Sequence, residues 1–514
     1  MRINRKTKPG IFYIILSFLL MVAAVLFMVK CSSGGTNTKK LPLEKLPNII
    51  VIVMDTVRYD HLSCYGYERE TTPNLTKLAK DSRMYMNAYS TSGWTPPSHA
   101  SLFTGLYPAA HGTTQENNIL PLGVNTMAEM LLNKGYDTYA ISENPLISMD
   151  NQFDQGFLHF FEAWLQPNYH YSNGAYNVFE LFLEQRNKKK PFFLFINLIE
   201  PHSPYDSARF FAHRFIRNIE INCIGNRYMD VVLGKKKFTA QEIEHLIDRY
   251  DGEILYTDYL LGKIIGQLKE NKIWRDTLFI VTSDHGENFM EHGLMDHVFS
   301  LNQELIHVPL IIKDPGLFPP NTKESAPVQL TDIFHTVRDI VGLDKNKFNS
   351  QGCSLLNKKE LVKRTVFAEY YAPKQVFTAI RNREMPLTEE EKKKLKQNKK
   401  ERQARRKFID LKEKFPFLEK YHRRIKTVIK DNFKLIWGSD GMHELYNLET
   451  DRNEQENLIN EKKYVKVKLR LLKELKKLVK KYQQESPIRR GKKTRKSNKK
   501  DKQTEKALKS LGYL

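Results

Sequence analysis

Short runs of apolar and β-branched residues recur along the first 365 positions of the chain, and longer segments with helical spacing separate them. The first run, 48–54, stops at Asp55 and shows no polar alternation, which is typical of a strand buried on both faces of a sheet. Strands that alternate with helices predict a mostly parallel sheet covered by helices on both sides. The other expected strands are 136–141, 191–198, 277–282 and 308–312, and the clearest helices are 126–134 and 242–268.

Reactive polar residues follow three of these runs. Asp55 follows the first run, His202 comes shortly after the third, and Asp284 and His285 follow the fourth. Ligands of parallel sheets bind beyond the carboxyl ends of the strands. We therefore expect these side chains to meet at one edge of the predicted sheet.

Beyond Val366 the pattern of apolar and charged residues changes. A highly charged, helix-like insertion spans 389–414, short strand-like pieces lie at 427–429 and 433–437, and a helix of 462–483 closes the region. These elements predict a smaller α+β C-terminal domain. Residues 486–506 are too polar to be buried and are expected to be disordered. The expected layout is an α/β domain of 47–365, a C-terminal subdomain of 366–485 and a basic tail of 486–514.

The N-terminal segment predicts a membrane tether. Residues 11–29 form a run of 19 residues without a charge, and four Lys and Arg precede it. That length matches a bilayer span of about 20 residues, and the cations favour a cytoplasmic N-terminus with the rest of the chain outside. The alternative is a lipoprotein signal ending at Cys31, although Lys30 is not the small residue that such sites carry. Residues 1–31 are the expected signal anchor and 32–46 the linker.

The net charge of +23 is concentrated in two stretches. From 392 to 414 there are 12 Lys and Arg against 3 acids, and from 489 to 502 there are 9 against 1. These stretches are either solvated faces or surfaces that attract anionic lipid or glycan. Nucleic-acid binding is not expected, because aromatic residues are sparse among the cations. The four cysteines include no pair at metal-ligand spacing, so neither a zinc module nor a disulfide scaffold is indicated.

The most specific motif lies at 93–108, where the chain reads Gly-Trp-Thr-Pro-Pro-Ser-His-Ala-Ser-Leu-Phe-Thr-Gly-Leu-Tyr-Pro. It resembles the sulfatase signature, in which Cys or Ser, any residue, Pro, Ser and Arg precede an Ala-Ser-Leu-Leu-Thr-Gly helix. The resemblance extends over about residues 47 to 514 and points to the alkaline-phosphatase superfamily. Further motifs similar to this family occur at 55–58, 72–75, 200–205, 283–287, 291–293, 444–448 and 511–514.

The resemblance implies one divalent metal ion held by Asp55, Thr95, Asp284 and His285. The chemistry agrees, since a negatively charged ester repels nucleophiles and needs a cation to neutralise the oxyanion and activate the attacking group. Oxygen ligands with one nitrogen suit Ca²⁺, Mg²⁺ or Mn²⁺, with Zn²⁺ as a further candidate.

Thr95 occupies the position of the nucleophile, which in formylglycine sulfatases is an oxidised Cys or Ser. Threonine cannot form the same aldehyde hydrate. In this respect the chain resembles lipoteichoic acid synthases and phosphoethanolamine transferases. His99 also stands where the signature has Arg, and Thr56 where the usual Asp-Asp pair has its second Asp. Pro96 and Pro97 favour a first helical turn at this point, although capping that helix would be an ordinary use of a threonine.

Three histidines are candidate catalytic groups. His202 and His297 can protonate a leaving oxygen or stabilise the ester's charge, because imidazole titrates near neutral pH. His99 can replace part of the arginine's contact with the anion. The expected function is hydrolysis of sulfate or phosphate esters on an extracytoplasmic glycan or lipid. A phosphoethanolamine- or phosphoglycerol-type transferase and a catalytically impaired anion-binding homologue are the alternatives.

Overall fold

The computed structural model describes residues 46–165, 174–206, 209–219, 221, 228–314, 316–348, 350–372, 418, 421–486 and 502–510. The predicted membrane segment, the lipoprotein alternative at Cys31 and the charged insertion 389–414 lie outside these residues. Among the helices of the described ranges, none combines the length and the apolar character needed to cross a bilayer.

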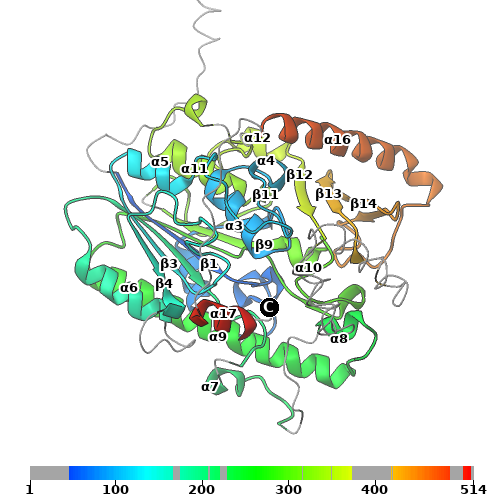
Figure 1. Ribbon diagram of the computed structural model, residues 1–514, viewed down its shortest axis with the longest axis horizontal. Coiled ribbons are helices and arrows are strands. Elements are labelled where there is room, and N and C mark those ends of the chain that lie inside the picture. The colour runs from blue at the N-terminus through cyan, green and yellow to red at the C-terminus, as the bar shows by residue number, and fades with distance from the viewer. Residues whose placement is uncertain are drawn as a thin grey trace, which may run out of the picture. The chain divides into compact units, whose positions relative to one another are not determined.

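A nine-stranded mixed sheet occupies the centre of the part that begins at Pro47 (Figure 1). The strand order is β10-β2-β9-β6-β1-β5-β3-β4, and β11 pairs with β2. Every recorded pairing is parallel except those of β9 with β2 and β6. The prediction of a mostly parallel sheet is therefore confirmed. The bounds are β1 Asn48–Met54, β2 Arg83–Tyr89, β3 Asp137–Ser142, β4 His159–Glu162, β5 Phe192–Leu198, β6 Thr277–Thr282, β9 His307–Lys313, β10 Thr322–Glu324 and β11 Val328–Gln329.

The strand β1 lies between β5 and β6, and this position explains its sequence. Ile52 pairs with Ile196 on one side and with Val281 on the other, and all three side chains are buried. A strand covered on both faces needs apolar residues at every position, so it lacks alternation. The Asp55 N–H donates to the Leu198 carbonyl over 2.8 Å, which holds Asp55 at the carboxyl edge of the sheet.

Helices cover both faces of the sheet (Figure 1). One layer holds α2 Pro73–Lys80, α6 Gly174–Gln185 and α9 Ala240–Glu270, and the other holds α3 Thr95–Thr104, α5 Met127–Asn133 and α11 Thr331–Ile340. All ten residues of α3 are buried, because the helix is enclosed by the sheet and by α11. It ends at Gly105 in the left-handed conformation, where an added Cβ would lie 2.9 Å from the Phe334 ring. The short elements are α4 Pro108–His111, α7 Arg209–Ala212, α8 Tyr228–Val232, α10 Gln303–Ile306, α12 Lys358–Val362, β7 Asn288–Phe289 and β8 Met295–Asp296.

A second, antiparallel sheet is built from β12 Val366–Tyr370, β13 Ile425–Lys430, β14 Phe433–Gly438 and β15 Glu444–Asn447. The helix α16, Val465–Gln484, packs its apolar face against β13 and β14. The predicted strands at 427–429 and 433–437 and the closing helix are confirmed. The division into two domains stays a prediction, since Pro47–Leu514 forms one compact unit.

A buried ion pair joins the second sheet to the segment after β6. Lys434 on β14 lies 2.5 Å from Glu454, and both side chains are inaccessible to solvent. The other carboxylate oxygen of Glu454 accepts hydrogen bonds from the Asn302 amide and the Gln303 N–H, at the start of α10. At the end of that short helix, Leu305 accepts from the Gly286 N–H over 2.9 Å. The two parts are thus linked through a few buried polar groups.

The prediction that residues 486–506 are disordered is wrong for its last part. Residues Lys502–Ser510 form the helix α17. Thr504 accepts a hydrogen bond from the Trp164 indole over 3.2 Å, and Leu508 is buried. Thr504, Ala507 and Leu508 share one face at helical spacing, so a segment with a polar composition still has a side that can be buried.

Candidate active site

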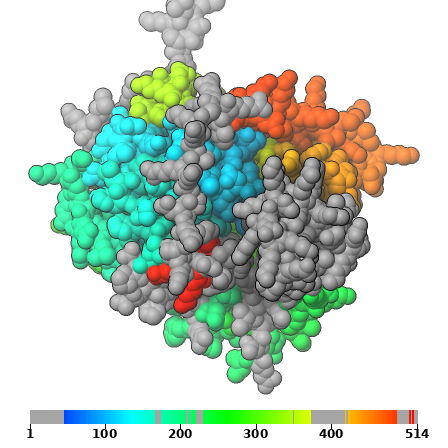
Figure 2. Space-filling model, viewed as in Figure 1, coloured from blue at the N-terminus to red at the C-terminus, as the bar shows by residue number. Residues whose placement is uncertain are grey.

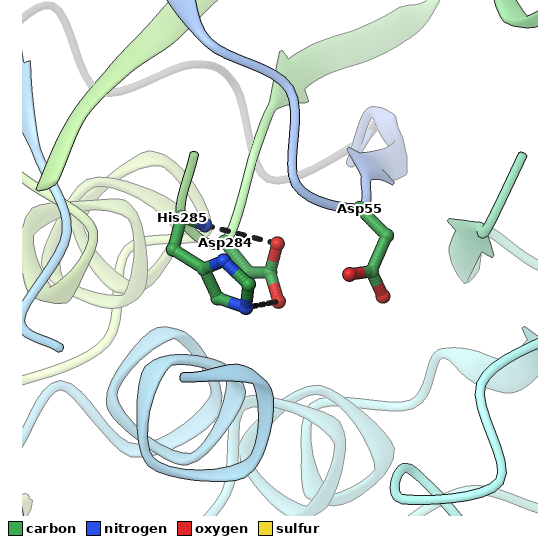
Figure 3. A group of neighbouring side chains, drawn as sticks. All are labelled: Asp55, Asp284 and His285. Carbon is green, nitrogen blue, oxygen red and sulfur yellow. Dashed lines mark hydrogen bonds and ion pairs between the residues drawn. The ribbon is translucent and has the colours of Figure 1, made fainter. Parts of the chain in front are cut away.

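Asp55, Asp284 and His285 converge at the carboxyl edge of the large sheet (Figure 3). They follow the adjacent strands β1 and β6, and one ligand atom from each lies within 4.8 Å of the others. All three side chains are buried. We call these residues the Asp55 cluster.

Each carboxylate of the Asp55 cluster uses only one of its oxygens for hydrogen bonds. Asp55 Oδ2 accepts from the amides of Asn144 and Asn197, over 2.8 and 3.1 Å. Asp284 Oδ1 accepts from the backbone N–H groups of Thr56 and His285, over 3.2 and 2.9 Å. Asp55 Oδ1 and Asp284 Oδ2 are buried and have no hydrogen-bond donor among the described residues. Two acceptor atoms are therefore left for a cation.

The electrostatics of the Asp55 cluster favour the same interpretation. Burial, together with the neighbouring Asp284 carboxylate, raises the pKa of Asp55 to about 7. Burial also raises the pKa of Asp284. Two ionised carboxylates side by side in a buried site are costly unless a cation compensates them. Two hard oxygens and one imidazole fit a divalent cation such as Ca²⁺, Mg²⁺, Mn²⁺ or Zn²⁺, so the cluster is a candidate metal site.

His285 presents its Nε2 atom to the cluster. Its Nδ1–H donates to the Gly286 carbonyl over 2.9 Å, which leaves the lone pair on Nε2. Burial, reinforced by nearby His297, lowers the pKa of His285 well below its usual value. A neutral imidazole with a fixed tautomer is the form that binds metal ions. The backbone of the cluster is held in place as well, since the Ser98 hydroxyl donates to the Asp284 carbonyl.

Thr95 is the first residue of α3, and its hydroxyl faces the Asp55 cluster. Thr95 Oγ1 lies 3.1 Å from His285 Nε2 in the buried centre of the site. The residue before the helix is Trp94, so Thr95 does not act as the capping residue. Pro96 and Pro97 occupy the first turn, and the N-terminus of a helix favours negative charge. The position combines a hydroxyl, a candidate metal site and a favourable helix dipole.

His297 belongs to a second cluster of two carboxylates and one imidazole. Its Nδ1 lies 2.6 Å from Asp296 Oδ1 and 3.3 Å from Glu287 Oε1. We call Glu287, Asp296 and His297 the Glu287 cluster. Burial opposes a charge on His297, but these two carboxylates outweigh burial and raise its pKa well above the usual value. The His297 ring stacks beside His285, with ring centroids 4.6 Å apart, so the two clusters are in contact.

His202 lies beside His297, whereas His99 lies against α3 and Asp284. The His202 ring lies 4.8 Å from that of His297, and its Nδ1–H donates to the Ser203 carbonyl over 2.7 Å. Burial and the charge of His297 lower the pKa of His202 to about 4, so its imidazole is neutral near pH 7. His99 donates from Nδ1 to the Thr95 carbonyl over 2.9 Å, and this nitrogen is 3.5 Å from Asp284 Oδ2. His99 therefore lies against the backbone of the first turn of α3 and against a carboxylate of the Asp55 cluster.

Sequence reasoning missed the groups that orient these side chains. Asn144 closely follows the strand β3, in the same way that Asp55 follows β1, so the rule of strand ends could have found it. Asn197 is a single polar residue inside the apolar strand β5, which is a second usable signal. Asp296 and Glu287 stand close to His297 and His285 in the sequence, but nothing in their spacing shows that both carboxylates reach the same imidazole nitrogen.

A mostly parallel sheet with a candidate metal site of buried carboxylates and an imidazole at its carboxyl edge fits an α/β hydrolase. A model of the Sulfatase family matches residues 47–343, more than half of the chain. The chain belongs to the sulfatase family of sulfuric ester hydrolases. The match ends before β12 and contains every residue of the two clusters and Thr95.

Curated relatives are similar over much of the chain. An arylsulfatase of Clostridium perfringens is 25% identical over 57% of this chain and 74% of its own length. Human arylsulfatase K is 25% identical over 66% of this chain and 71% of its own. An ulvan-active sulfatase of Formosa agariphila is 24% identical over 90% of this chain and 80% of its own. The chain spans 65% of the length of cattle arylsulfatase K.

Solved structures share the fold. The phosphonate monoester hydrolase of Agrobacterium radiobacter superimposes with a TM-score of 0.64 at 20% identity, covering 85% of this chain and 96% of that protein. A protein solved in complex with its substrate D-glucosamine-2-N,6-O-disulfate superimposes equally well, with a TM-score of 0.64 at 20% identity, covering 87% of this chain and all of the other. At these identities the likeness concerns the alkaline-phosphatase-like fold.

Proposed function

We propose that the protein is a metal-dependent hydrolase of sulfate or phosphate esters in which the Thr95 hydroxyl is the nucleophile. The observation that carries this proposal is the position of Thr95 Oγ1, 3.1 Å from His285 Nε2 and at the N-terminus of α3. A divalent cation in the Asp55 cluster would neutralise the oxyanion of the ester and acidify the hydroxyl. The arylsulfatase names of the curated relatives support ester hydrolysis.

The residues of the two clusters suggest how the reaction proceeds. Thr95 loses its proton to solvent, its oxygen forms a bond to the phosphorus or sulfur atom, and the bond from that atom to the leaving alcohol breaks. The protonated His297 gives a proton to the leaving oxygen. A water molecule then attacks the same atom and gives one proton to His297, the bond to Thr95 breaks, and the Thr95 oxygen takes up a proton from solvent. The neutral His202 lies beside His297 and can assist either proton transfer.

Thr95 favours phosphate esters over sulfate esters. A formylglycine hydrate expels sulfate by elimination through its second hydroxyl, which a threonine ester lacks. The covalent intermediate must therefore be resolved by attack on phosphorus or sulfur, and attack on phosphorus is the easier of the two. An acceptor alcohol in place of water would turn the same chemistry into a phosphoethanolamine- or phosphoglycerol-type transfer.

Matched substrates test this proposal. Purified protein is assayed against an aryl sulfate, an aryl phosphate monoester and an aryl phosphate diester, with Ca²⁺, Mg²⁺, Mn²⁺ and Zn²⁺ in turn. We expect turnover of a phosphate ester, a mass-spectrometric adduct on Thr95 and no turnover by the Thr95→Ala variant. Sulfatase turnover that persists in that variant contradicts the mechanism. Metal binding without turnover of any ester indicates the anion-binding homologue instead.

The proposed substrate is a sulfated or phosphorylated glycan or lipid outside the cytoplasm. Support for a glycan comes from the ulvan-active relative and from the disulfated glucosamine bound to a structural neighbour. Support for the location comes from the sequence of residues 11–29. Full-length protein should fractionate with membranes and be released when 11–29 is deleted. Labelling of Cys31 with a lipid precursor distinguishes the lipoprotein alternative, and recovery of full-length protein in the soluble cytoplasm contradicts both.

A further inference from the structure

The helix α16 carries an unusual charge for a helix that covers a sheet. It contains eight Lys and Arg and a single acid, Glu474. Most of its apolar side chains are used inside the protein, since Leu471, Leu475, Leu478 and Tyr482 are buried against the second sheet, whereas Val465 and Leu469 are exposed. The helix lies along the surface, as the orange to red band of Figures 1 and 2 shows. A role for its cations must therefore be sought on the side of the helix that faces solvent.

All of these cations except Lys468, which donates to the Ile459 carbonyl, are collected on one side of the helix. Lys466, Arg470, Lys473, Lys477 and Lys480 follow one another at intervals of three or four residues, and all are exposed. This spacing places them on one side of the helix, opposite the buried leucines. From Lys466 to Lys480 the row extends over about 21 Å, at 1.5 Å per residue. Lys476 and Lys481 broaden it.

This face has almost no compensating acids. Arg470 pairs with Asp431 over 3.0 Å, at a site where both side chains are half exposed. Glu474 is directed to the sheet, where it contacts Thr365 and Lys430. Within the part of the chain that the structure describes, the other cations of the row have no ion pair. Like charges at this spacing repel one another and destabilise a helix, so a bound polyanion would stabilise it by neutralising the row.

We propose that this cationic face of α16 is a docking surface for an acidic polysaccharide whose charges are sulfate or phosphate groups. The row of cations matches an extended anionic chain better than a single small anion. A membrane surface fits less well, because helices that bind membranes insert a continuous apolar face, and here that face is buried in the protein, with only Val465 and Leu469 exposed on the N-terminal half of the helix. The choice of a polysaccharide rests on the proposed function, whereas binding does not depend on catalysis.

Substitutions on the exposed face test the proposal. In one variant Lys466, Lys473, Lys477 and Lys480 are replaced by Gln, which keeps a good helix former at each position. The matched control replaces four exposed lysines elsewhere, Lys188, Lys189, Lys323 and Lys359. Binding of full-length protein in neutral detergent to immobilised dextran sulfate is measured from 50 to 300 mM NaCl. Circular dichroism and melting curves confirm that both variants fold.

We expect the α16 variant to bind dextran sulfate about tenfold more weakly at low salt, with a shallower dependence on salt, because fewer counterions are released. The control variant should bind within about twofold of the unmodified protein. Equal weakening in both variants, or none in the α16 variant, overturns the proposal. So does a selective loss of binding to vesicles of phosphatidylglycerol and phosphatidylcholine with unchanged binding to dextran sulfate. Turnover of a small aryl ester should be the same in both variants. This assay therefore distinguishes a failure of the docking proposal from a failure of the proposed function.

Discussion

The Asp55 cluster and the Glu287 cluster have the same composition but opposite electrostatics. Each consists of two buried carboxylates and one histidine, and the two histidine rings are in contact. The difference is the direction of Nδ1. In His285 it donates to a backbone carbonyl, so a lone pair faces the carboxylates and the cluster lacks a positive charge. In His297 it faces both carboxylates, so the imidazole is itself the cation.

This comparison shows that the same residue types form a candidate metal site or a charged imidazole depending on a single hydrogen bond. The Asp55 cluster needs a cation from outside, because two of its carboxylate oxygens have no donor among the described residues. The Glu287 cluster supplies its own cation and can give up a proton. A candidate metal site and a charged imidazole therefore lie side by side, which suits the proposed cleavage of an anionic ester.

The largest effect is expected for Thr95→Ala. Removing the hydroxyl beside the Asp55 cluster removes the bond-forming atom, and kcat should fall by at least about 10³-fold. The Thr95→Ser variant keeps a hydroxyl and should retain measurable turnover. Melting curves of both variants should match the unmodified protein. Equal activity of the Ala and Ser variants would remove Thr95 from the mechanism.

Asp284→Asn should abolish metal binding without unfolding the protein. The amide oxygen can still accept from the Thr56 and His285 N–H groups, but the charge that attracts a cation is lost. We expect affinity for Mn²⁺ or Zn²⁺ to fall by at least about 100-fold, measured by calorimetry. The melting temperature of the unmodified protein should rise with added metal, whereas that of the variant should not. Unchanged affinity would place the metal elsewhere.

Asp296→Asn should distinguish the roles of the two clusters. It removes the closer carboxylate from His297 Nδ1 and leaves the Asp55 cluster intact. We expect kcat/KM to fall by about tenfold to a hundredfold, because the proton donor is less charged and less well oriented, while the metal content per chain stays the same. A parallel loss of metal would show instead that Asp296 supports the metal site.

The stability of the metal-free protein should depend on the charge of Asp55. Its pKa of about 7 in the folded state exceeds the value near 4 of an unfolded chain. Folding therefore takes up a proton between these pH values, and the folded state loses stability as the pH rises from about 4 to 7. Asn at position 55 has no such titrating proton. In the presence of a chelator, the free energy of unfolding of Asp55→Asn should therefore rise relative to that of the unmodified protein as the pH increases from about 4 to 7, by on the order of 2 kcal/mol.

Urea unfolding of both proteins at several pH values measures this difference. Asn144→Ala, which removes one donor to Asp55, serves as a control that perturbs the cluster without removing its charge. A constant difference between Asp55→Asn and the unmodified protein from pH 4 to 8 would mean that folding does not change the pKa of the Asp55 carboxyl group.

The smallest effect is expected for Glu287→Gln. Its oxygen is 3.3 Å from His297 Nδ1, farther than that of Asp296, and the amide oxygen can still accept the hydrogen bond. We expect a loss in kcat/KM of about twofold to threefold. A loss as large as that of Asp296→Asn would show that the two carboxylates act as one unit.

The fold could be predicted from the sequence where burial alone determines the pattern. The strand β1 is covered on both faces, so its uninterrupted apolar run identified it to the residue. The strand β2 was missed, because its sequence Arg-Met-Tyr-Met-Asn-Ala-Tyr mixes polar and apolar residues without a clear period. The reversed direction of β9 was not predictable either, since an apolar strand has the same composition in both directions.

The site could be predicted only as far as the reactive residues themselves. Asp55, Asp284 and His285 follow strands that are neighbours in the sheet, and strand ends are visible in the sequence. The roles of the two histidines were not visible, because the direction of Nδ1 depends on backbone and carboxylate positions set by the whole fold. His99 illustrates the same limit. The sequence suggested a contact with the ester's anion, but it could not show that the Nδ1 atom of His99 is used by the Thr95 carbonyl on its own helix.

The buried pair of Lys434 and Glu454 has a consequence for the order in which the protein is made. Glu454 leaves the ribosome 169 residues after His285. Until then the Asn302 and Gln303 groups at the start of α10 lack their acceptor, and α10 in turn provides the carbonyl that holds Gly286, next to His285. A nascent or truncated chain that ends before Glu454 thus contains every residue of the Asp55 cluster but lacks the acceptor that holds the start of α10. The outermost link to the backbone beside His285 is therefore made only after the second sheet has been synthesised.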